Sequence, residues 1–232
     1  MHFIRRVWNL VLRFLLFFLL ASILLTILYR FVPVPVTPLM LIRLYQQYSE
    51  NKPLRLEKKW VCLEDISPEM QKAVIASEDQ SFFQHNGFDW ESIKKAYHYN
   101  LKNLKKGKKK MRGGSTISQQ TAKNVFLFPQ RNIARKALEA YFTVLIELLW
   151  NKQRILEVYL NVIETGDGIY GVEAAARNYY KISARELSTH QAAALAAILP
   201  NPRKWNPVKK NNLVSSRKNW IISQMKYIQL HK

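Results

Sequence analysis

The sequence predicts a mainly α-helical fold in one domain, behind a single N-terminal membrane-spanning helix. Its 232 residues can bury one sizeable core and are few for two. Helix-start signals recur along the chain, and a long apolar run opens it. The alternation of apolar and polar residues that indicates strands is scarce, which leaves helices to build the core.

The N-terminal segment, 1–31, predicts the membrane-spanning helix. The run from Phe14 to Tyr29 is uncharged, and its extension back to Val7 adds only Arg13. A span needs about 20 apolar residues, and an arginine near one end can reach the interface. Arginines precede the run and acids do not, which favours a cytoplasmic N-terminus. The alternative is a cleaved secretory signal peptide, but the run is long and no A-x-A pattern follows it.

A stalk is expected at 32–59. The alternating prolines from Val32 to Pro38 resist helix formation and favour an extended spacer. Residues 39–59 are polar and are expected to be only partly regular. The remainder, 60–232, is predicted to form the globular domain.

Three stretches of that domain carry strong helix patterns. Ser67-Pro68-Glu69 combines a cap, a proline at the first position and an acid in the first turn. Helical patterns also cover 132–150 and 152–160, and the first of these has an apolar stripe on one side. The stripe consists of Ile133, Ala137, Tyr141, Val144, Leu145 and Leu148.

Two capping boxes near the C-terminus predict further helices. They are Ser183 with Glu186, and Ser188 with Gln191. The second opens an alanine-rich helix that Pro200 ends.

The chain is strongly basic. Lysine and arginine number 36 against 16 aspartates and glutamates, which gives a formal net charge of +20. Such a surplus indicates an anionic partner: nucleic acid, an anionic membrane surface or a phosphorylated substrate. The single cysteine, Cys62, excludes an internal disulfide.

The first stretch that can carry chemistry is SEDQSFFQHNGFDW, at 77–90. Glu78 and Asp79 end an apolar helical pattern, and two phenylalanines follow them. A carboxylate beside apolar rings can act as a proton acceptor near neutral pH. An exposed acidic helix end is the simpler interpretation of this pair taken alone.

The second stretch is GGSTISQQTAKN, at 113–124. Thr116 and Gln119 fit a capping box, so a helix is expected to start at or near Ser115. The free N–H groups and partial positive charge of a helix start suit a phosphate. An ordinary capped helix is the alternative, but it leaves the two glycines and the nearby cations unexplained.

Gly113 and Gly114 are expected to give the backbone free angles in front of that helix. The nucleotide loop G-x-x-x-x-G-K-[ST] does not fit, because Arg112 stands where its second glycine should be. The interpretation is therefore an anion site that is not a nucleotide loop.

The third stretch is RKALE, in which Arg135, Lys136 and Glu139 share one helix face. Two cations and a carboxylate can face a phosphate-bearing substrate, although a surface ion-pair cluster gives the same pattern. The five histidines are scattered and no H-E-x-x-H motif occurs. The sequence thus predicts no metal site, and it leaves a divalent cation, Mg or Mn, open as a cofactor.

Five stretches in this order resemble the motif series of the family 51 glycosyltransferases. These are the peptidoglycan glycosyltransferases of class A penicillin-binding proteins and their monofunctional relatives. The stretches are EDQSFFQHNGFD, GGSTISQQTAKN, RKALEA, ILEVYLN…GIYGVEAAA and AALAAILPNP, which together cover 78–202. The resemblance implies a lysozyme-like, mostly helical fold. It also implies polymerisation of lipid II with release of undecaprenyl pyrophosphate.

The resemblance also assigns roles to residues. Glu78 matches the base that deprotonates the 4-hydroxyl of the acceptor sugar, and Glu139 matches a second functional carboxylate in the donor-side pocket. Positions around the pyrophosphate and the sugar are matched by Thr116, Gln120, Lys123, Arg135 and Lys136. Positions that shape the first motif are matched by Asp79, Phe82, His85 and Gly87. Also expected at the substrate are Gly113, Gly114, Ser115, Gln119 and Asn124.

Two departures from the family pattern stand out. Ser118 replaces the usual threonine and keeps the hydroxyl. The lysine-rich run at 105–110 is longer than usual and is expected to form a flexible loop that faces the membrane.

The expected location is the bacterial inner membrane, with a cytoplasmic N-terminus and a periplasmic catalytic domain. The expected partners are lipid II, the growing glycan strand, membrane lipid and cell-wall synthesis or division proteins, and not nucleic acid. Two alternatives stay open: a lysozyme-like or lytic enzyme that cleaves peptidoglycan, and an anchored basic module that binds a polyanion. The second alternative leaves Glu78, Glu139 and the glycines unexplained.

Overall fold

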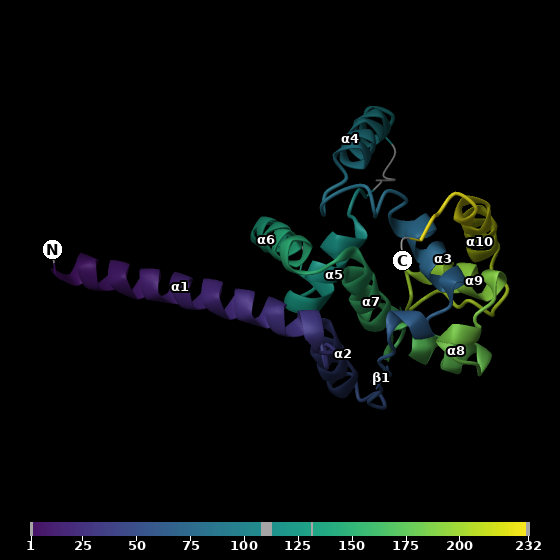
Figure 1. Ribbon diagram of the computed structural model, residues 1–232, viewed down its shortest axis with the longest axis horizontal. Helices are drawn as coiled ribbons and strands as arrows, with labels where there is room; N and C mark the ends of the chain where they lie inside the picture. Colours follow the sequence, from purple (N-terminus) through teal and green to yellow (C-terminus); the bar gives the residue numbers. More distant parts are fainter. Residues whose placement is uncertain (1, 108–112, 131, 231–232) are drawn as a thin grey trace.

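The structure is a computed structural model that describes residues 2–107, 113–130 and 132–230, and this part of the chain is mainly helical, as predicted (Figure 1). The helices are α1 (His2–Phe31), α2 (Pro38–Ser49), α3 (Pro68–Glu78), α4 (Trp90–Lys105), α5 (Ile117–Phe126), α6 (Ile133–Leu149), α7 (Lys152–Val162), α8 (Val172–Tyr180), α9 (Thr189–Ile198) and α10 (Asn212–Met225). The described residues also form the 3-10 turns η1 (Leu63–Asp65) and η2 (Ala184–Glu186), and the strands β1 (Glu57–Lys58), β2 (Glu164–Gly166) and β3 (Ile169–Tyr170). Residues 108–110 of the predicted lysine-rich loop lie outside the described ranges.

The N-terminal helix α1 extends far out of the body of the protein (Figure 1). Between Phe3 and Phe31 it is long and apolar enough to cross a membrane. Hydrogen bonds hold its last turns against the body of the protein. Trp150 Nε1 donates to the carbonyl of Thr26 (2.8 Å), and Arg154 donates from two nitrogens to the carbonyl of Tyr29 (2.8 and 3.0 Å).

The segment 39–59 is more regular than the sequence suggested. Pro38 is the first residue of α2, and the side chain of Thr37 caps the helix by accepting the N–H of Met40 (3.4 Å). This is the same cap-and-proline signal that starts α3. The strand β1 pairs in parallel with β3 in a sheet of order β1-β3-β2. The end of the predicted stalk is therefore part of the sheet.

The core is built around α9. Every residue from Ala192 to Ile198 is buried, so the alanine-rich stretch is a central helix that is apolar on all sides. Both α3 and α10 pack against α9 and against each other, while α5 packs against α6 and α7. The end of α3 and the start of α5 meet where Asp79 accepts the N–H of Ile117, and both carry predicted site residues.

The helix starts predicted from capping signals are formed, and in each a side-chain oxygen accepts a backbone N–H. The pairs are Ser67 with Glu69, Thr116 with Gln119, and Ser188 with Gln191. The box of Ser183 and Glu186 opens only η2, a single 3-10 turn. The helices predicted at 132–150 and 152–160 are α6 and α7.

Helix α6 has an unusual distribution of apolar residues. Its buried side carries Glu139, Phe142, Thr143 and Ile146. The apolar stripe that the sequence predicted is divided between core and solvent. Tyr141 and Leu145 pack against the core, whereas Ile133 is 90% exposed and Leu148 is 75% exposed.

Candidate active site

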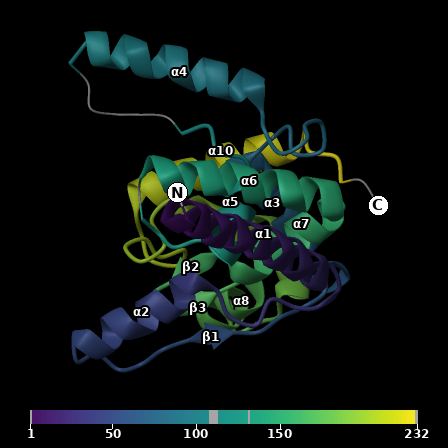
Figure 2. The same ribbon diagram turned by 90° about the vertical axis from the view of Figure 1, so that its left-hand side faces the viewer.

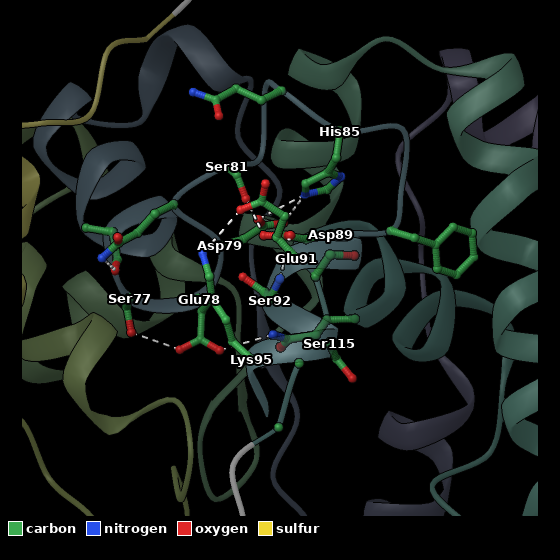
Figure 3. A pocket seen from close by; sticks show the side chains of 18 of the residues that line it. Ser77, Glu78, Asp79, Ser81, His85, Asp89, Glu91, Ser92, Lys95 and Ser115 are labelled. Carbon is green, nitrogen blue, oxygen red and sulfur yellow. Dashed lines mark hydrogen bonds and ion pairs between the residues drawn. The ribbon is translucent and has the colours of Figure 1, made fainter. Parts of the chain in front are cut away.

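A cavity of about 1090 Å³ opens between the end of α3, the start of α4 and α10 (Figure 3). The predicted site residues that line it are Glu78, Asp79, His85, Gly113, Gly114, Ser115, Thr116 and Gln120. Those outside its lining are Phe82, Gln119, Lys123, Asn124, Arg135, Lys136 and Glu139. The predicted residues therefore fall into one group that lines the cavity and one on α5 and α6, with Phe82 outside both.

Glu78 is the last residue of α3 and its carboxylate is held from three directions. Oε1 accepts from the hydroxyl of Ser77 (2.8 Å), and Oε2 accepts from Nε2 of Gln120 (3.0 Å). The third donor is Nη2 of Arg217 on α10, which lies 3.3 Å from Oε1. A carboxylate offers about four acceptor positions, so a held carboxylate can still accept a proton from a ligand in the cavity.

The amide of Gln120 is itself oriented by a buried residue. The hydroxyl of Tyr159 donates to Oε1 of Gln120 (3.2 Å), which turns the amide nitrogen toward Glu78. Burial raises the pKa of Tyr159 well above its ordinary value, and the nearby charges of Glu78 and Asp79 add to this. Tyr159 therefore stays protonated and remains a donor.

Asp79 connects the loop after α3 to the start of α5. Its carboxylate accepts the N–H of Ile117 (3.0 Å) and lies 3.0 Å from Nε2 of His85. An acid at a helix N-terminus is stabilised by the helix dipole. The structure thus gives Asp79 and His85 a positioning role at the edge of the cavity.

Asp89 holds the other end of the same loop. It caps α4 through the N–H of Ser92 (2.8 Å) and accepts the hydroxyl of Ser81 (2.5 Å). Burial alone would raise the pKa of Asp89, but these hydrogen bonds outweigh it and lower the pKa to about 2. The loop is therefore fixed by an ionised carboxylate at neutral pH.

The start of α5 is fixed by the predicted capping box. Thr116 Oγ1 also donates to the carbonyl of Gly87 (2.6 Å), so Thr116 and Gln119 serve the backbone in this structure. Gly87 has φ +87°, and a Cβ there would lie 2.8 Å from Thr143 Cγ2. Glycine is required at Gly87 for both reasons.

The two glycines in front of α5 differ from the prediction. Neither Gly113 nor Gly114 is among the residues with positive φ. A Cβ on Gly114 would lie 3.3 Å from the Cα of Ile93 in α4, whereas one on Gly113 would meet open space. Gly114 therefore allows close approach of α4, and free backbone angles are not the reason for it.

Three residues of the second group form an ion cluster on α6. Arg135 Nη1 lies 2.6 Å from Glu139 Oε2, and Lys136 pairs with the other oxygen. The carboxylate of Glu139 is almost fully buried, while the side chain of Lys136 is half exposed. Glu139 is thus neutralised by two cations, one of which reaches solvent.

Lys123 on α5 belongs to the second group and interacts electrostatically with the ion cluster and with Glu78. Burial lowers the pKa of its ammonium, and the charge of Glu139 opposes that shift, as does the charge of Glu78 more weakly. Within the described ranges, no hydrogen bond or ion pair engages this ammonium. A buried ammonium without a paired carboxylate can bind an anion.

The sequence did not point to several residues of this site. Arg217 lies on α10, beyond the last motif, in a stretch with no distinguishing pattern. Ser77 and Tyr159 lie within quoted stretches of the sequence, but no role was predicted for either. Phe82, in contrast, was expected at the substrate and is fully buried, with the Lys152 ammonium 4.7 Å from its ring centre.

A metal site is not supported by the side chains described. In residues 2–107, 113–130 and 132–230, no group of three or more His, Cys, Asp or Glu side chains could hold a metal ion.

Comparison with known proteins gives a consistent result. A family model described as transglycosylase matches residues 46–226. A biosynthetic peptidoglycan transglycosylase of Bdellovibrio bacteriovorus is 52% identical over 210 residues, which is 90% of this chain and 82% of the relative. Proteins of the same name from Caulobacter vibrioides and Bacteroides thetaiotaomicron are 50% and 49% identical, over 93% and 92% of this chain and 90% and 84% of their own lengths.

Proposed function

The chain belongs to the transglycosylase family, whose fold is lysozyme-like, and on this premise we propose that it polymerises lipid II into β-1,4-linked glycan strands. It is a glycosyltransferase of peptidoglycan synthesis. One observation supports the finer proposal most. The carboxylate of Glu78 lies in the wall of a large cavity, held by donors from three helices, with a buried cation and an ion cluster on the neighbouring helices.

Glu78 is proposed as the base. It takes the proton of the acceptor's 4-hydroxyl, and the hydroxyl oxygen attacks the anomeric carbon of the growing strand. A new glycosidic bond forms with inversion while the bond to the pyrophosphate oxygen breaks. Undecaprenyl pyrophosphate leaves with the electron pair. The donors from Ser77, Gln120 and Arg217 keep the carboxylate aimed at the cavity.

The leaving pyrophosphate is proposed to be stabilised by cations. Lys123 is buried, and Arg135 and Lys136 lie on the adjoining helix. Fixed cations stabilise charge that develops in a transition state more than mobile water does. A pyrophosphate that departs as an anion needs no protonating acid, so one base is enough.

Cleavage of finished peptidoglycan is the competing enzyme reaction. A glycosidase needs one carboxylic acid to protonate a sugar leaving group, in addition to a base or nucleophile. The other predicted carboxylates already have partners: Glu139 accepts from both Arg135 and Lys136, and Asp79 accepts the N–H of Ile117. The arrangement therefore favours transfer over hydrolysis.

The location is proposed from α1. The helix fits a membrane anchor, with the N-terminus in the cytoplasm and the domain in the periplasm of the inner membrane. An anchor holds the enzyme where a lipid-linked substrate is and raises its effective concentration. The remaining partners we propose are the growing strand and cell-wall synthesis or division proteins.

Two parallel incubations of the purified full chain test this function. With lipid II in detergent micelles, the expected products are long glycan strands and undecaprenyl pyrophosphate. With purified sacculi and no lipid II, no soluble fragments are expected. Release of fragments from sacculi without polymerisation of lipid II would instead identify a lytic enzyme.

A further inference from the structure

The hydroxyl of Tyr159 is a buried polar group that the proposed reaction does not use. The side chain is 1% exposed, and its hydroxyl donates to Oε1 of Gln120 (3.2 Å). In the part of the chain that the structure describes, no second hydrogen bond engages this hydroxyl. Burying a hydroxyl costs free energy unless it is hydrogen-bonded. The contact with Gln120 is therefore what makes this group tolerable in the core.

The amide of Gln120 connects the hydroxyl to the carboxylate of Glu78. Nε2 of Gln120 donates to Oε2 of Glu78 (3.0 Å). The hydrogen bonds thus run from Tyr159 on α7 through α5 to the end of α3, and these helices lie together in the body of the protein (Figure 2). Among the described residues, Gln120 is the one hydrogen-bond donor to Oε2, whereas Ser77 and Arg217 both contact Oε1.

The orientation of this amide decides what Oε2 of Glu78 meets. The oxygen and the nitrogen of an amide have nearly the same shape, so a half-turn of the group exchanges an acceptor for a donor. After such a turn the amide oxygen of Gln120 would face Oε2, which would lose its donor. Hydrogen bonds to a carboxylate favour its ionised form. The turned amide therefore disfavours the form of Glu78 that accepts a proton.

Tyr159 opposes the turn because its hydroxyl has a single hydrogen. The phenol oxygen can accept from an amide nitrogen, but the phenol hydrogen would then lose its acceptor. A buried donor without an acceptor is destabilising. Burial, together with the nearby charges of Glu78 and Asp79, raises the pKa of Tyr159 well above its ordinary value, so this hydrogen is present at neutral pH. One orientation of the amide thus satisfies both Tyr159 and Glu78.

We propose that Tyr159 is a positioning residue of the transfer reaction, which acts through the amide of Gln120 to keep Glu78 in its proton-accepting form. The proposal rests on the proposed function, in which Glu78 is the base. When Glu78 carries the acceptor's proton, a turned amide would accept that proton in a hydrogen bond and retain it. By opposing the turn, the hydroxyl favours release of the proton to solvent and return of the carboxylate for the next transfer.

A mutant cycle on the purified full chain tests the proposal. Tyr159→Phe removes the hydroxyl alone and is expected to lower kcat for lipid II polymerisation about tenfold, with little change in KM. Gln120→Met removes the amide, keeps a side chain of similar length and is expected to lose as much or more. In the Gln120→Met background, Tyr159→Phe should change kcat by less than about twofold, because the group through which it acts is gone.

Tyr170→Phe is the matched control. Tyr170 is also 1% exposed and lies on β3, outside the lining of the cavity. Its hydroxyl has no hydrogen-bond partner among the described residues. The control is expected to keep the wild-type kcat, and thermal unfolding shows that each variant is folded at the assay temperature.

A readout without turnover comes from the side-chain amide signals of Gln120 in proton–nitrogen correlation spectra, which are assigned by their loss in Gln120→Met. These signals are expected to shift in Tyr159→Phe and to stay in place in Tyr170→Phe. They report on the amide even if Glu78→Gln polymerises lipid II at the wild-type rate, a result that would refute the proposed function instead.

Three results would overturn the role of Tyr159. The first is a wild-type kcat for Tyr159→Phe or for Gln120→Met while Glu78→Gln is inactive. The second is an equal loss from Tyr159→Phe with and without Gln120, because the hydroxyl would then act by another route. The third is an unchanged set of Gln120 signals in Tyr159→Phe, because the hydroxyl would then not hold the amide.

Discussion

The guanidinium of Arg217 contacts the carboxylate of Glu78, with Nη2 3.3 Å from Oε1. The same nitrogen donates to the hydroxyl of Ser77 (2.9 Å), which in turn donates to that carboxylate oxygen. The C-terminal helix α10 thus completes a site whose other parts come from α3 and α5. Because α10 also packs on α3 and α9, the packing of the core fixes this contact.

Replacing Arg217 with alanine is expected to lower kcat for lipid II polymerisation about ten- to hundredfold. The estimate follows from about 1.5–3 kcal/mol for a hydrogen bond to a charged group. KM should change less, and Arg217→Lys should recover part of the rate. Initial rates over a series of lipid II concentrations give both constants. Arg185→Ala, on a side chain that is 74% exposed and outside the cavity, is the control.

A rise in KM with unchanged kcat would contradict this account of Arg217. It would mean that the guanidinium binds substrate and does not position Glu78.

Lys123→Met is expected to stabilise the protein at pH 7 while it abolishes or strongly reduces polymerisation. Burial lowers the pKa of Lys123, so the folded state disfavours the proton that the unfolded state binds. The cost is full below the folded pKa and disappears as pH rises toward the ordinary value of 10.5. Thermal unfolding should show a higher Tm for the variant, by about 2–4 °C per kcal/mol, and the difference should shrink at pH 10.

An equal or lower Tm for Lys123→Met at pH 7 would show that the ammonium is compensated in the folded protein. Lys72→Met serves as the comparison, because Lys72 makes only a long contact to Glu69 (3.6 Å).

The Arg135–Glu139 pair is expected to be strongly coupled. A double-mutant cycle with Arg135→Met and Glu139→Gln should give about 1–3 kcal/mol, because the Glu139 side chain is only 4% exposed. The Glu91–Lys95 pair has the same i,i+4 spacing with side chains 85% and 71% exposed, and its cycle should give about 0.5 kcal/mol or less. Denaturant unfolding measures both. Equal coupling energies for the two pairs would show that Arg135 and Glu139 interact no more strongly than an exposed surface pair.

The contact between α7 and the anchor should control the mobility of the segment 32–37, which joins the anchor to α2. Arg154 donates to the carbonyls of Tyr29 and Val32, the latter at 2.7 Å. Arg154→Met keeps the apolar stem and loses these bonds. We expect amide hydrogen exchange at Val32, Val34, Val36 and Thr37 to become about tenfold faster or more. Unchanged exchange there would show that packing alone holds the anchor.

Local sequence signals predicted the parts of this fold that depend on neighbouring residues. Thr116 and Gln119 are three positions apart, and the capping box they form is visible in the sequence. The shared face of Arg135, Lys136 and Glu139 follows in the same way from helical spacing. The helix α2 carried the same kind of signal at Thr37 and Pro38, but the prolines before it favoured an extended spacer.

Contacts between distant elements could not be predicted from such signals. Arg217 reaches Glu78 only because α10 packs against α3, and no pattern around Arg217 indicates that packing. Likewise, periodicity identified the apolar stripe of α6 but not what it faces. A stripe that packs on a core and a stripe that is exposed have the same spacing. Gly114 shows the same limit, because its close neighbour Ile93 lies on another helix.

The central claim is that Glu78 is the base of the transfer reaction, and one comparison tests it most directly. Polymerisation of lipid II is measured for the wild type, for Glu78→Gln, and for Glu64→Gln as an exposed control outside the cavity. The account predicts that Glu78→Gln lowers kcat by about 100-fold or more while the affinity for lipid II stays similar, and that Glu64→Gln behaves as wild type. Polymerisation by Glu78→Gln at the wild-type rate would contradict it.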